Sequence, residues 1–289
     1  MRATEAFRAI GVSCLAHLTG NANAVRNADL EGVHQMRVGL RRMRAVISLF
    51  SDMLDSAGRE RIKSELKWLT SELGPAREVD VFVSEKIKPA GREVTPQRGR
   101  QALEEEFIDR RERALKRAAA AVTSSRFRVL LVDAMEWLQQ GRGTGGDANA
   151  KIGKLAPKIM QRRLRKLQKV APKLERMSAL QRHKVRIKVK KLRYAVGFFE
   201  SLFPAKHDQK QLERLAKRLK SIQSALGALN DARAHQDMTT ASALAAPRRH
   251  RRARAFVAGI LLGREQESTR PLIKATRKDI ETLGEIGTL

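Results

Sequence analysis

The sequence predicts an all-α protein, and three observations support that prediction. Apolar residues recur at helical spacing along nearly the whole chain of 289 residues. Alternating β-branched runs bounded by turn residues, the pattern of strands, are hard to find. Hydrophobic residues make up 42% of the chain, which is enough for a substantial core in one large domain or two small ones. We therefore expect a folded helical protein and not a disordered polycation.

The first expected helix has Phe7, Ile10, Cys14 and Leu18 on one face, so Cys14 is expected to be a core residue. Asp29 and Ser178 are candidate N-caps, and Ser178 begins a capping box with Gln181. The other helices follow from periodicity alone. In chain order the expected helices are 4–18, 30–53, 59–73, 78–89, 97–121, 124–140, 154–170, 179–202, 207–227, 231–245, 249–263 and 265–283.

The clearest linker is QGRGTGGDANAKIG, residues 140–153. Its glycines and small polar residues disfavour a helix. We expect a single domain over 1–289, in which an N-terminal helical half (1–140) and a C-terminal helical half (154–289) are joined by a Gly-rich linker (141–153).

A stripe of cations runs along the expected helix that contains VHQMRVGLRRMRAVISLF, residues 33–50. With His34 at zero on a helical wheel, Arg44, Arg37 and Arg41 fall at about 280°, 300° and 340°. Residues 32–51 contain no acidic side chain, although a solvated face usually mixes its charges. An anion is therefore expected beside the stripe. The arc from about 120° to 260° is apolar and is expected to face the core: Val33, Met36, Leu40, Met43, Val46, Ile47 and Phe50.

The same pattern occurs again in RHKVRIKVKKLRYAV, residues 182–196. At an offset of 149, His34, Arg37, Arg41, Arg42 and Arg44 align with His183, Arg186, Lys190, Lys191 and Arg193. At an offset of 153, Lys67 and Gly74 align with Lys220 and Gly227. The repeat predicts an internal duplication and a functional anion site, because a solvated surface has no reason to keep its charge pattern through a duplication.

The overall charge points to the same kind of partner. There are 59 Lys and Arg residues against 31 acidic residues, a net charge of +28 and a pI near 11.2. Such an excess favours a polyanion, which can be nucleic acid, an anionic membrane or polyphosphate. One cysteine permits no internal disulfide, and neither a signal peptide nor a window of roughly 18 apolar residues is found. We expect a soluble, cytoplasmic protein.

Both histidines are expected in the first turns of their helices, where backbone N–H groups and the helix dipole favour anions. Arginine offers a fork of donors that matches phosphate oxygens, and cations on successive turns favour a chain of phosphates. The neighbouring Arg37 and Arg41 should lower the pKa of His34 in the free protein.

Three alternatives to a phosphate chain stay open. A metal site could form if His34 and His183 met, but the surrounding cations would repel a dication. Catalysis could use His34 as phosphoacceptor or general acid with a carboxylate from a loop (Glu78, Asp80 or Asp231), although no Walker, kinase or nucleophile-elbow motif is present. Nucleic acid would be bound through its backbone only, because aromatic residues make up 4% of the chain and only Tyr194 interrupts a basic motif.

The paired motifs VHQMRVGLRRMR and HKVRIKVKKLRY, followed by LGPAREVDV and LGALNDA, resemble the CHAD family, the conserved histidine α-helical domain. The resemblance extends from EAFRAIGVSCLAHL to ARAFVAGILLGREQE. It implies two pseudosymmetric helical bundles around a central basic cavity that binds inorganic polyphosphate. It also implies a location at polyphosphate granules in the cytoplasm, beside granule-associated proteins.

The resemblance implies a binding protein without cofactor, metal or enzymatic activity, since no segment is left for the triphosphate-processing CYTH domain of many relatives. Glu78 departs from the aspartate expected after LG, which puts in doubt any role that needs a short carboxylate there. Nucleic acid is expected to bind only non-specifically, and a membrane not at all. The residues expected to bind polyphosphate are His34, Arg37, Arg41, Arg42, Arg44, Lys67, Arg77, His183, Arg186, Lys190, Lys191, Arg193 and Lys220.

Overall fold

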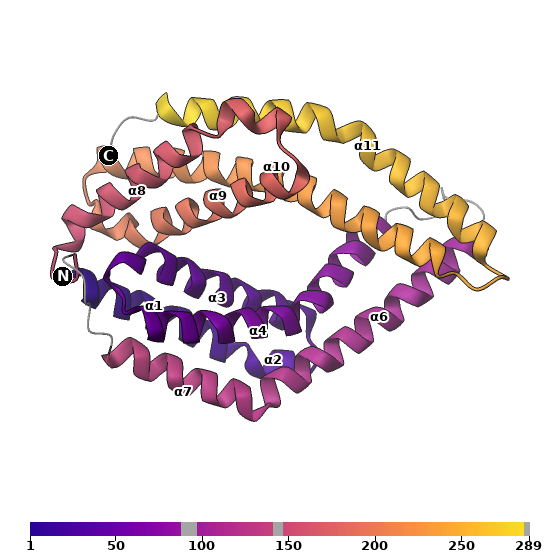
Figure 1. Ribbon diagram of the computed structural model, residues 1–289, viewed down its shortest axis with the longest axis horizontal. Coiled ribbons are helices and arrows are strands. Elements are labelled where there is room, and N and C mark those ends of the chain that lie inside the picture. Colours follow the sequence, from indigo (N-terminus) through magenta and orange to yellow (C-terminus); the bar gives the residue numbers. More distant parts are fainter. Residues whose placement is uncertain (88–96, 141–146, 286–289) are drawn as a thin grey trace. The chain divides into compact units, whose positions relative to one another are not determined.

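The computed structural model describes residues 1–87, 97–140 and 147–285. Those residues are almost entirely helical (Figure 1), and their only extended pairing is an isolated bridge between Arg2 and Lys151. The prediction of an all-α fold is therefore confirmed.

The chain forms two compact units, Met1–Ile152 and Gly153–Leu289. The boundary lies at the end of the segment expected as a linker, of which residues 141–146 lie outside the described residues. Each unit is described by itself below.

The first unit consists of helices packed side by side, with α1 on α3 and α7, and α4 on α3 and α6 (Figure 1). A short π-helical segment, Val83–Ile87, follows α4. The core of the first unit contains packed aromatic rings: Phe7 lies between Phe50 and Trp137, at ring-centroid distances of 5.7 and 5.3 Å. Its α-helices are α1 (Ala3–Gly20), α2 (Ala22–Arg26), α3 (Leu30–Leu49), α4 (Ser56–Phe82), α6 (Gln97–Thr123) and α7 (Ser125–Gln140).

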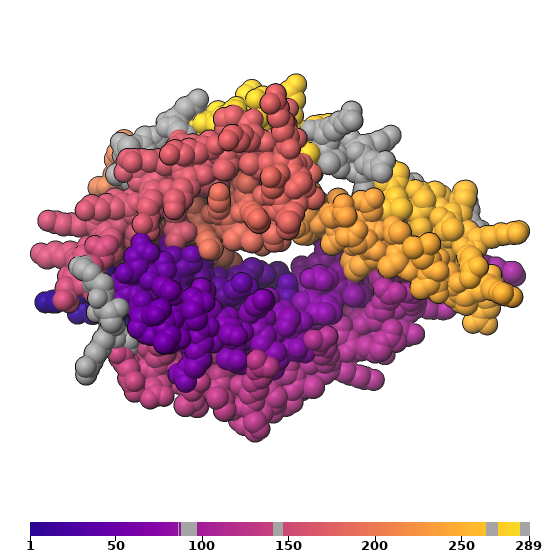
Figure 2. All heavy atoms as spheres, viewed as in Figure 1, coloured from indigo at the N-terminus to yellow at the C-terminus, as the bar shows by residue number. Residues whose placement is uncertain are grey.

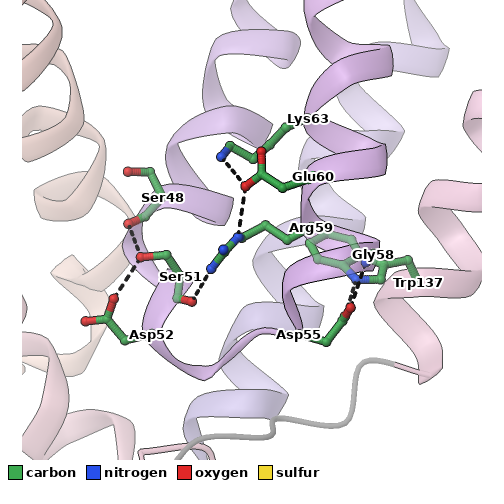
Figure 3. A network of polar contacts seen from close by, with 9 residues as sticks. All are labelled: Ser48, Ser51, Asp52, Asp55, Gly58, Arg59, Glu60, Lys63 and Trp137. Carbon is green, nitrogen blue, oxygen red and sulfur yellow. Dashed lines mark hydrogen bonds and ion pairs between the residues drawn. The ribbon is translucent and has the colours of Figure 1, made fainter.

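A polar network fixes the turn between α3 and α4 (Figure 3). Asp55 is the N-cap of α4, and its carboxylate accepts hydrogen bonds from the Gly58 amide at 2.6 Å and from Trp137 Nε1 at 3.1 Å. Arg59 Nη1 donates to the Ser51 carbonyl at 2.8 Å and so ties the first turn of α4 to the chain that leaves α3. This network sets the position at which α4 runs back along α3.

The second unit packs α9 and α11 against α10. The apolar faces of α9 and α10 are buried, with Val189, Leu192, Leu219 and Ile222 at 0% exposure. Short 3-10 helices, Ala171–Arg176 and Glu200–Leu202, flank α9. The α-helices of this unit are α8 (Ile152–Gln168), α9 (Ala179–Phe199), α10 (Lys206–Leu244) and α11 (Arg251–Glu281).

Three of the expected helix boundaries are wrong, because single helices replace three expected pairs. The pairs 59–73 with 78–89, 207–227 with 231–245, and 249–263 with 265–283 correspond to α4, α10 and α11, and residues 88–89 lie outside the described residues. In α4 the helix continues through Pro75 because Leu73, Ala76 and Val79 on either side of it are buried. Packing of an apolar face outweighs one missing hydrogen bond.

Candidate functional site

The structure places the first cationic stripe on α3 as the sequence predicts. Asp29 is the N-cap of this helix, and its carboxylate accepts hydrogen bonds from the amides of Glu31 and Gly32 at 3.1 and 3.0 Å. All seven residues of the expected apolar face are buried. His34, Arg37 and Arg41 are half-buried at the border of that face.

Arg37 lies against the backbone of α4 at Gly74. Its Nη1 donates to the Thr70 carbonyl at 3.2 Å, and a Cβ added to Gly74 would lie 3.4 Å from the same nitrogen. The Glu78 carboxylate lies on the same side, 3.7 Å from that Cβ position. The pKa of Arg37 is lowered, first by burial and next by Arg41, while Glu78 opposes the shift. The guanidinium is therefore a partly desolvated charge with a like charge beside it.

His34 joins this cluster from one turn earlier on α3. Its pKa is lowered, first by burial and then by Arg77, with smaller effects of Arg41 and Arg37, while Glu31 opposes them. The predicted direction is confirmed, although burial has a larger effect than the neighbouring cations on which the prediction rested. Within the described part of the chain, the buried Nδ1 of His34 has no hydrogen-bond partner. The imidazole is thus kept neutral and retains hydrogen-bonding capacity.

Arg77, Lys67 and Arg44 extend the cluster along the two helices. Arg77 forms an ion pair with Asp80 at 2.8 Å and lies close enough to influence His34. Lys67 is exposed on the face of α4 that also contains Gly74 and Arg77, and Arg44 is exposed on α3. Because Arg37 lies over Gly74 while His34 lies near Arg77, the two helices run in opposite directions. Lys67 on α4 and Arg44 on α3 therefore lie at about the same height along the pair of antiparallel helices.

Arg42 points elsewhere. It hydrogen-bonds the buried thiol of Cys14 on α1, and burial raises the pKa of that thiol to about 11 against the effect of Arg42. On the helical wheel Arg42 lies at about 80°, outside the stripe. Cys14 is a core residue, as expected, and the structure associates Arg42 with α1 instead of α4.

The second unit contains the same local contact. Arg186 on α9 lies against Gly227 of α10, where an added Cβ would be 3.7 Å from Nη2 and 4.0 Å from the Asp231 carboxylate. These residues are the counterparts of Arg37, Gly74 and Glu78 at the two offsets seen in the sequence. Ser178 caps α9, and the capping box with Gln181 is confirmed. An arginine, a helical glycine and a carboxylate thus recur in both units.

The two histidines have different neighbours. His183 Nδ1 hydrogen-bonds Asn230 Oδ1, and the amide of Asn230 donates to Asp231 at 3.3 Å. That second bond places the amide oxygen toward His183, so Nδ1 is the protonated nitrogen. Asn230 occupies the position that Arg77 occupies in the first unit. The first histidine therefore has a cation beside it where the second has a neutral acceptor.

The remaining predicted residues of the second unit lie on the same two helices. Lys190, Lys191 and Arg193 are half-buried on α9, and Lys220 is exposed on α10. The Arg193 guanidinium lies 5.8 Å from the centre of the Tyr194 ring, and Tyr194 stacks on Phe198 at 6.1 Å. Tyr194 thus already has a stacking partner within its own helix.

The carboxylates considered for catalysis lie in helices and not in loops, which corrects that expectation. Glu78 and Asp80 belong to α4, and Asp231 belongs to α10. Among the residues with described positions, no three His, Cys, Asp or Glu side chains gather to form a metal site. None of the described helices is long and apolar enough to cross a membrane.

Comparison with known proteins identifies the family. The sequence model of the CHAD domain family matches residues 9–240 of this chain. The chain belongs to the CHAD domain family. Its fold is similar to that of the CHAD domain from the plant Ricinus communis, with a TM-score of 0.81 and 28% identity over 98% of this chain and 93% of the plant chain. It is also similar to PptA from Streptomyces chartreusis, with a TM-score of 0.66 and 20% identity over 96% of this chain and 99% of PptA. No curated protein matches the sequence.

Sequence reasoning did not identify the residues that position the cations of this CHAD domain. Thr70 accepts from Arg37 and Asn230 from His183, and neither was a candidate. In the sequence, Gly74 and Gly227 stand out only as an aligned pair. A helical glycine repeated at the same place in two halves was the available signal, since glycine costs about 1 kcal/mol against alanine inside a helix.

Proposed function

We propose that this CHAD domain binds inorganic polyphosphate through the cationic clusters of its two units. The cluster of the first unit is formed by His34, Arg37, Arg41 and Arg77, and that of the second by His183, Arg186 and Lys190. We further propose that Arg44, Lys67, Arg193 and Lys220 extend these clusters, and that Arg42 and Lys191 contribute charge at their edges. The observation that supports the proposal most is the recurrence of an arginine laid on a helical glycine in both units.

The electrostatics of the first cluster favour a bound polyanion. Arg37 is partly desolvated beside Arg41, and Arg77 lies near both Arg37 and His34. Bringing cations together costs free energy, and an anion among them reverses the sign of each interaction. A phosphate chain presents an oxyanion at every step, so it can contact cations on successive helical turns. Donors that read base edges are not required for this ligand.

The proposal includes the biological setting implied by the family resemblance. We propose that the two units arose by duplication and that the protein binds without catalysing a reaction. Its location would be cytoplasmic, at polyphosphate granules. Binding rather than turnover is favoured because the carboxylates in the clusters lie beside arginines and are in place to orient them.

A competition assay tests the proposed function. Labelled long-chain polyphosphate is bound to the wild-type protein at physiological salt and displaced by duplex DNA, by heparin or by unlabelled polyphosphate. We expect polyphosphate to displace the label at a lower phosphate concentration than DNA does. Equal displacement by DNA, or a preference for a base sequence, would contradict the proposal and indicate a nucleic-acid-binding protein.

Glycine substitutions test whether the arginines must lie on the helix backbone. In Gly74→Leu and Gly227→Leu the new side chain takes the place of the guanidinium, and we expect a loss of polyphosphate affinity of about tenfold or more, the equivalent of about 1.4 kcal/mol. Gly197→Leu on α9 is the matched control, because a Cβ there meets nothing within 4 Å. Calorimetric titration measures affinity, and thermal unfolding confirms folding. Unchanged affinity in both Leu variants would exclude a role for this contact in binding.

Proton uptake on binding tests the role of His34. Its free-state pKa is lowered by burial and by Arg77, Arg41 and Arg37, so bound polyphosphate should raise it. By linkage, the added affinity is fully present below the free-state pKa and is lost as pH rises through the bound-state pKa. Calorimetry in buffers of different ionisation enthalpy measures the uptake at acidic, neutral and alkaline pH.

The comparison for this experiment is between His34→Gln, His183→Gln and the double variant. Proton uptake that is smaller in His34→Gln than in the wild type supports the assignment. If the wild type takes up no protons, or the double variant takes up as many, the histidines serve as neutral hydrogen-bonding or packing groups.

A further inference from the structure

A second basic surface lies on α8, outside the clusters described above. Every exposed residue from 153 to 169 except Gly153 is basic: Lys154, Lys158, Arg162, Arg165, Lys166 and Lys169. No acidic residue occurs between Asp147 and Glu175. Figure 2 shows long side chains projecting outward from the region of α8.

Five of these cations form a single row, here called the outer stripe: Lys154, Lys158, Arg162, Arg165 and Lys169. At about 100° per residue they fall within an arc of about 80°, and at about 1.5 Å per residue they span about 22 Å. The buried residues of α8, among them Ala156, Ile159, Met160 and Leu167, lie on the opposite side of the helix. Lys169 directly follows the last residue of α8, so the outer stripe faces solvent along the helix and one residue beyond it.

The outer stripe differs from the surface around α6, where arginines pair with carboxylates, as in the ion pairs Arg100–Glu104 at 2.9 Å and Arg117–Glu72 at 2.5 Å. Like charges at helical spacing destabilise a helix by about 0.2–0.5 kcal/mol per pair. α8 contains no acidic residue that could offset this repulsion within the helix. A bound polyanion would screen the repulsion between these cations and attract each of them.

The shape of the outer stripe selects among polyanions. Its exposed side contains no aromatic or large apolar side chain that could stack on bases or enter a membrane. The amide side chains of α8, Gln161 and Gln168, are half-buried beside the row and do not belong to its exposed residues, which leaves the row without exposed amides to read base edges. A single row of cations on one helix matches a single-file chain of charges better than the two backbones of a duplex.

We propose that the outer stripe is a second polyphosphate-binding surface, which holds long chains but not short ones. This inference rests on the proposed function, because it assumes polyphosphate as the ligand. A chain that fills only a histidine cluster would not need the outer stripe. A chain long enough to engage both surfaces gains affinity from the second contact, because that step is intramolecular. The outer stripe would thereby set the preference for chain length.

The test removes the charge of the outer stripe without disturbing the helix. The stripe variant replaces Lys154, Lys158, Arg165 and Lys169 by Gln, which has a similar helix propensity. The control variant replaces the exposed Arg248, Arg249, Arg251 and Arg252 by Gln, so that both variants lose the same charge. Binding of tripolyphosphate, long-chain polyphosphate and duplex DNA is measured for both, and circular dichroism confirms their helical content.

We expect the stripe variant to lose about tenfold or more in affinity for long-chain polyphosphate and to bind tripolyphosphate like the wild type. Losing four contacts should also lower the slope of log affinity against log salt by about three. In the control variant, the affinity for long-chain polyphosphate and the salt slope should differ much less from those of the wild type. Equal affinity of the stripe and control variants for long chains would overturn the inference, as would a loss confined to DNA.

The two proposals fail in different ways. If the wild type binds no polyphosphate, both are wrong. If charge reversal of Arg37 with Arg41 and of Arg186 with Lys190 leaves binding intact while the stripe variant loses it, the histidine clusters are not the binding site and the outer stripe stands.

Discussion

Replacing Arg37 and Arg41 by glutamate is expected to weaken the binding of long-chain polyphosphate by about a hundredfold or more. Each charge-assisted hydrogen bond contributes about 1.5–3 kcal/mol, and about 1.4 kcal/mol corresponds to a factor of ten. The new carboxylates would also repel the ligand. The matched control reverses Arg113 and Lys116, which are exposed on α6 and change the net charge equally. Affinity is measured by calorimetric titration.

The corresponding pair in the second unit tests whether its cluster also binds polyphosphate. Reversal of Arg186 and Lys190 should weaken the binding of long-chain polyphosphate about as much as reversal of Arg37 and Arg41, because the same arginine–glycine contact recurs there and the new carboxylates would again repel the ligand. Lys210 and Arg214, exposed on α10, provide the control. Unchanged affinity in this variant, with a loss only when Arg37 and Arg41 are reversed, would contradict a role for the second cluster.

The affinity for long-chain polyphosphate should fall steeply with salt. Cations that neutralise a linear polyanion release its condensed counterions, and for DNA about six to ten such contacts lower affinity by about 10³–10⁵ between about 50 and 200 mM salt. The two clusters contain enough Lys and Arg residues for an effect of this size. The measurement is a series of titrations at increasing sodium chloride concentration, analysed as log affinity against log salt.

A nearly flat salt dependence would show that the cationic clusters are not the binding surface. The double reversal of Arg37 and Arg41 should itself lower the slope, whereas the α6 control should leave it almost unchanged. Comparing these slopes separates direct phosphate contacts from the effect of net charge.

Much of the fold could be predicted from local chemistry. The wheel of α3 predicted its buried face residue by residue, because a helix with one apolar arc has one way to face a core. Asp29 and Ser178 were predicted as caps because their side chains accept from the first free amides of the helix. The stripe of His34, Arg37 and Arg41 followed from the same geometry.

Other features depended on contacts between helices that a sequence does not specify. Residues 74–77 looked like a break because Gly74 and Pro75 disfavour a helix, but apolar neighbours keep α4 continuous. The association of Arg42 with Cys14 requires knowing that α1 packs on α3. The Asn230 contact of His183 requires knowing that α9 and α10 lie side by side. In each case tertiary packing outweighs local preference.

The two ends of the first unit are joined by hydrogen bonds. The Ala3 amide donates to the Ala150 carbonyl at 2.9 Å, and the Ile152 amide donates to the Met1 carbonyl at 3.2 Å. Arg2 Nη1 adds a bond to Asn149 Oδ1 at 2.9 Å. Units whose ends adjoin tolerate circular permutation and insertion into other proteins. Residues 1–152 are therefore suited to serve as a closed module, which could be reopened at a surface turn or transplanted as a cassette while its core stays intact.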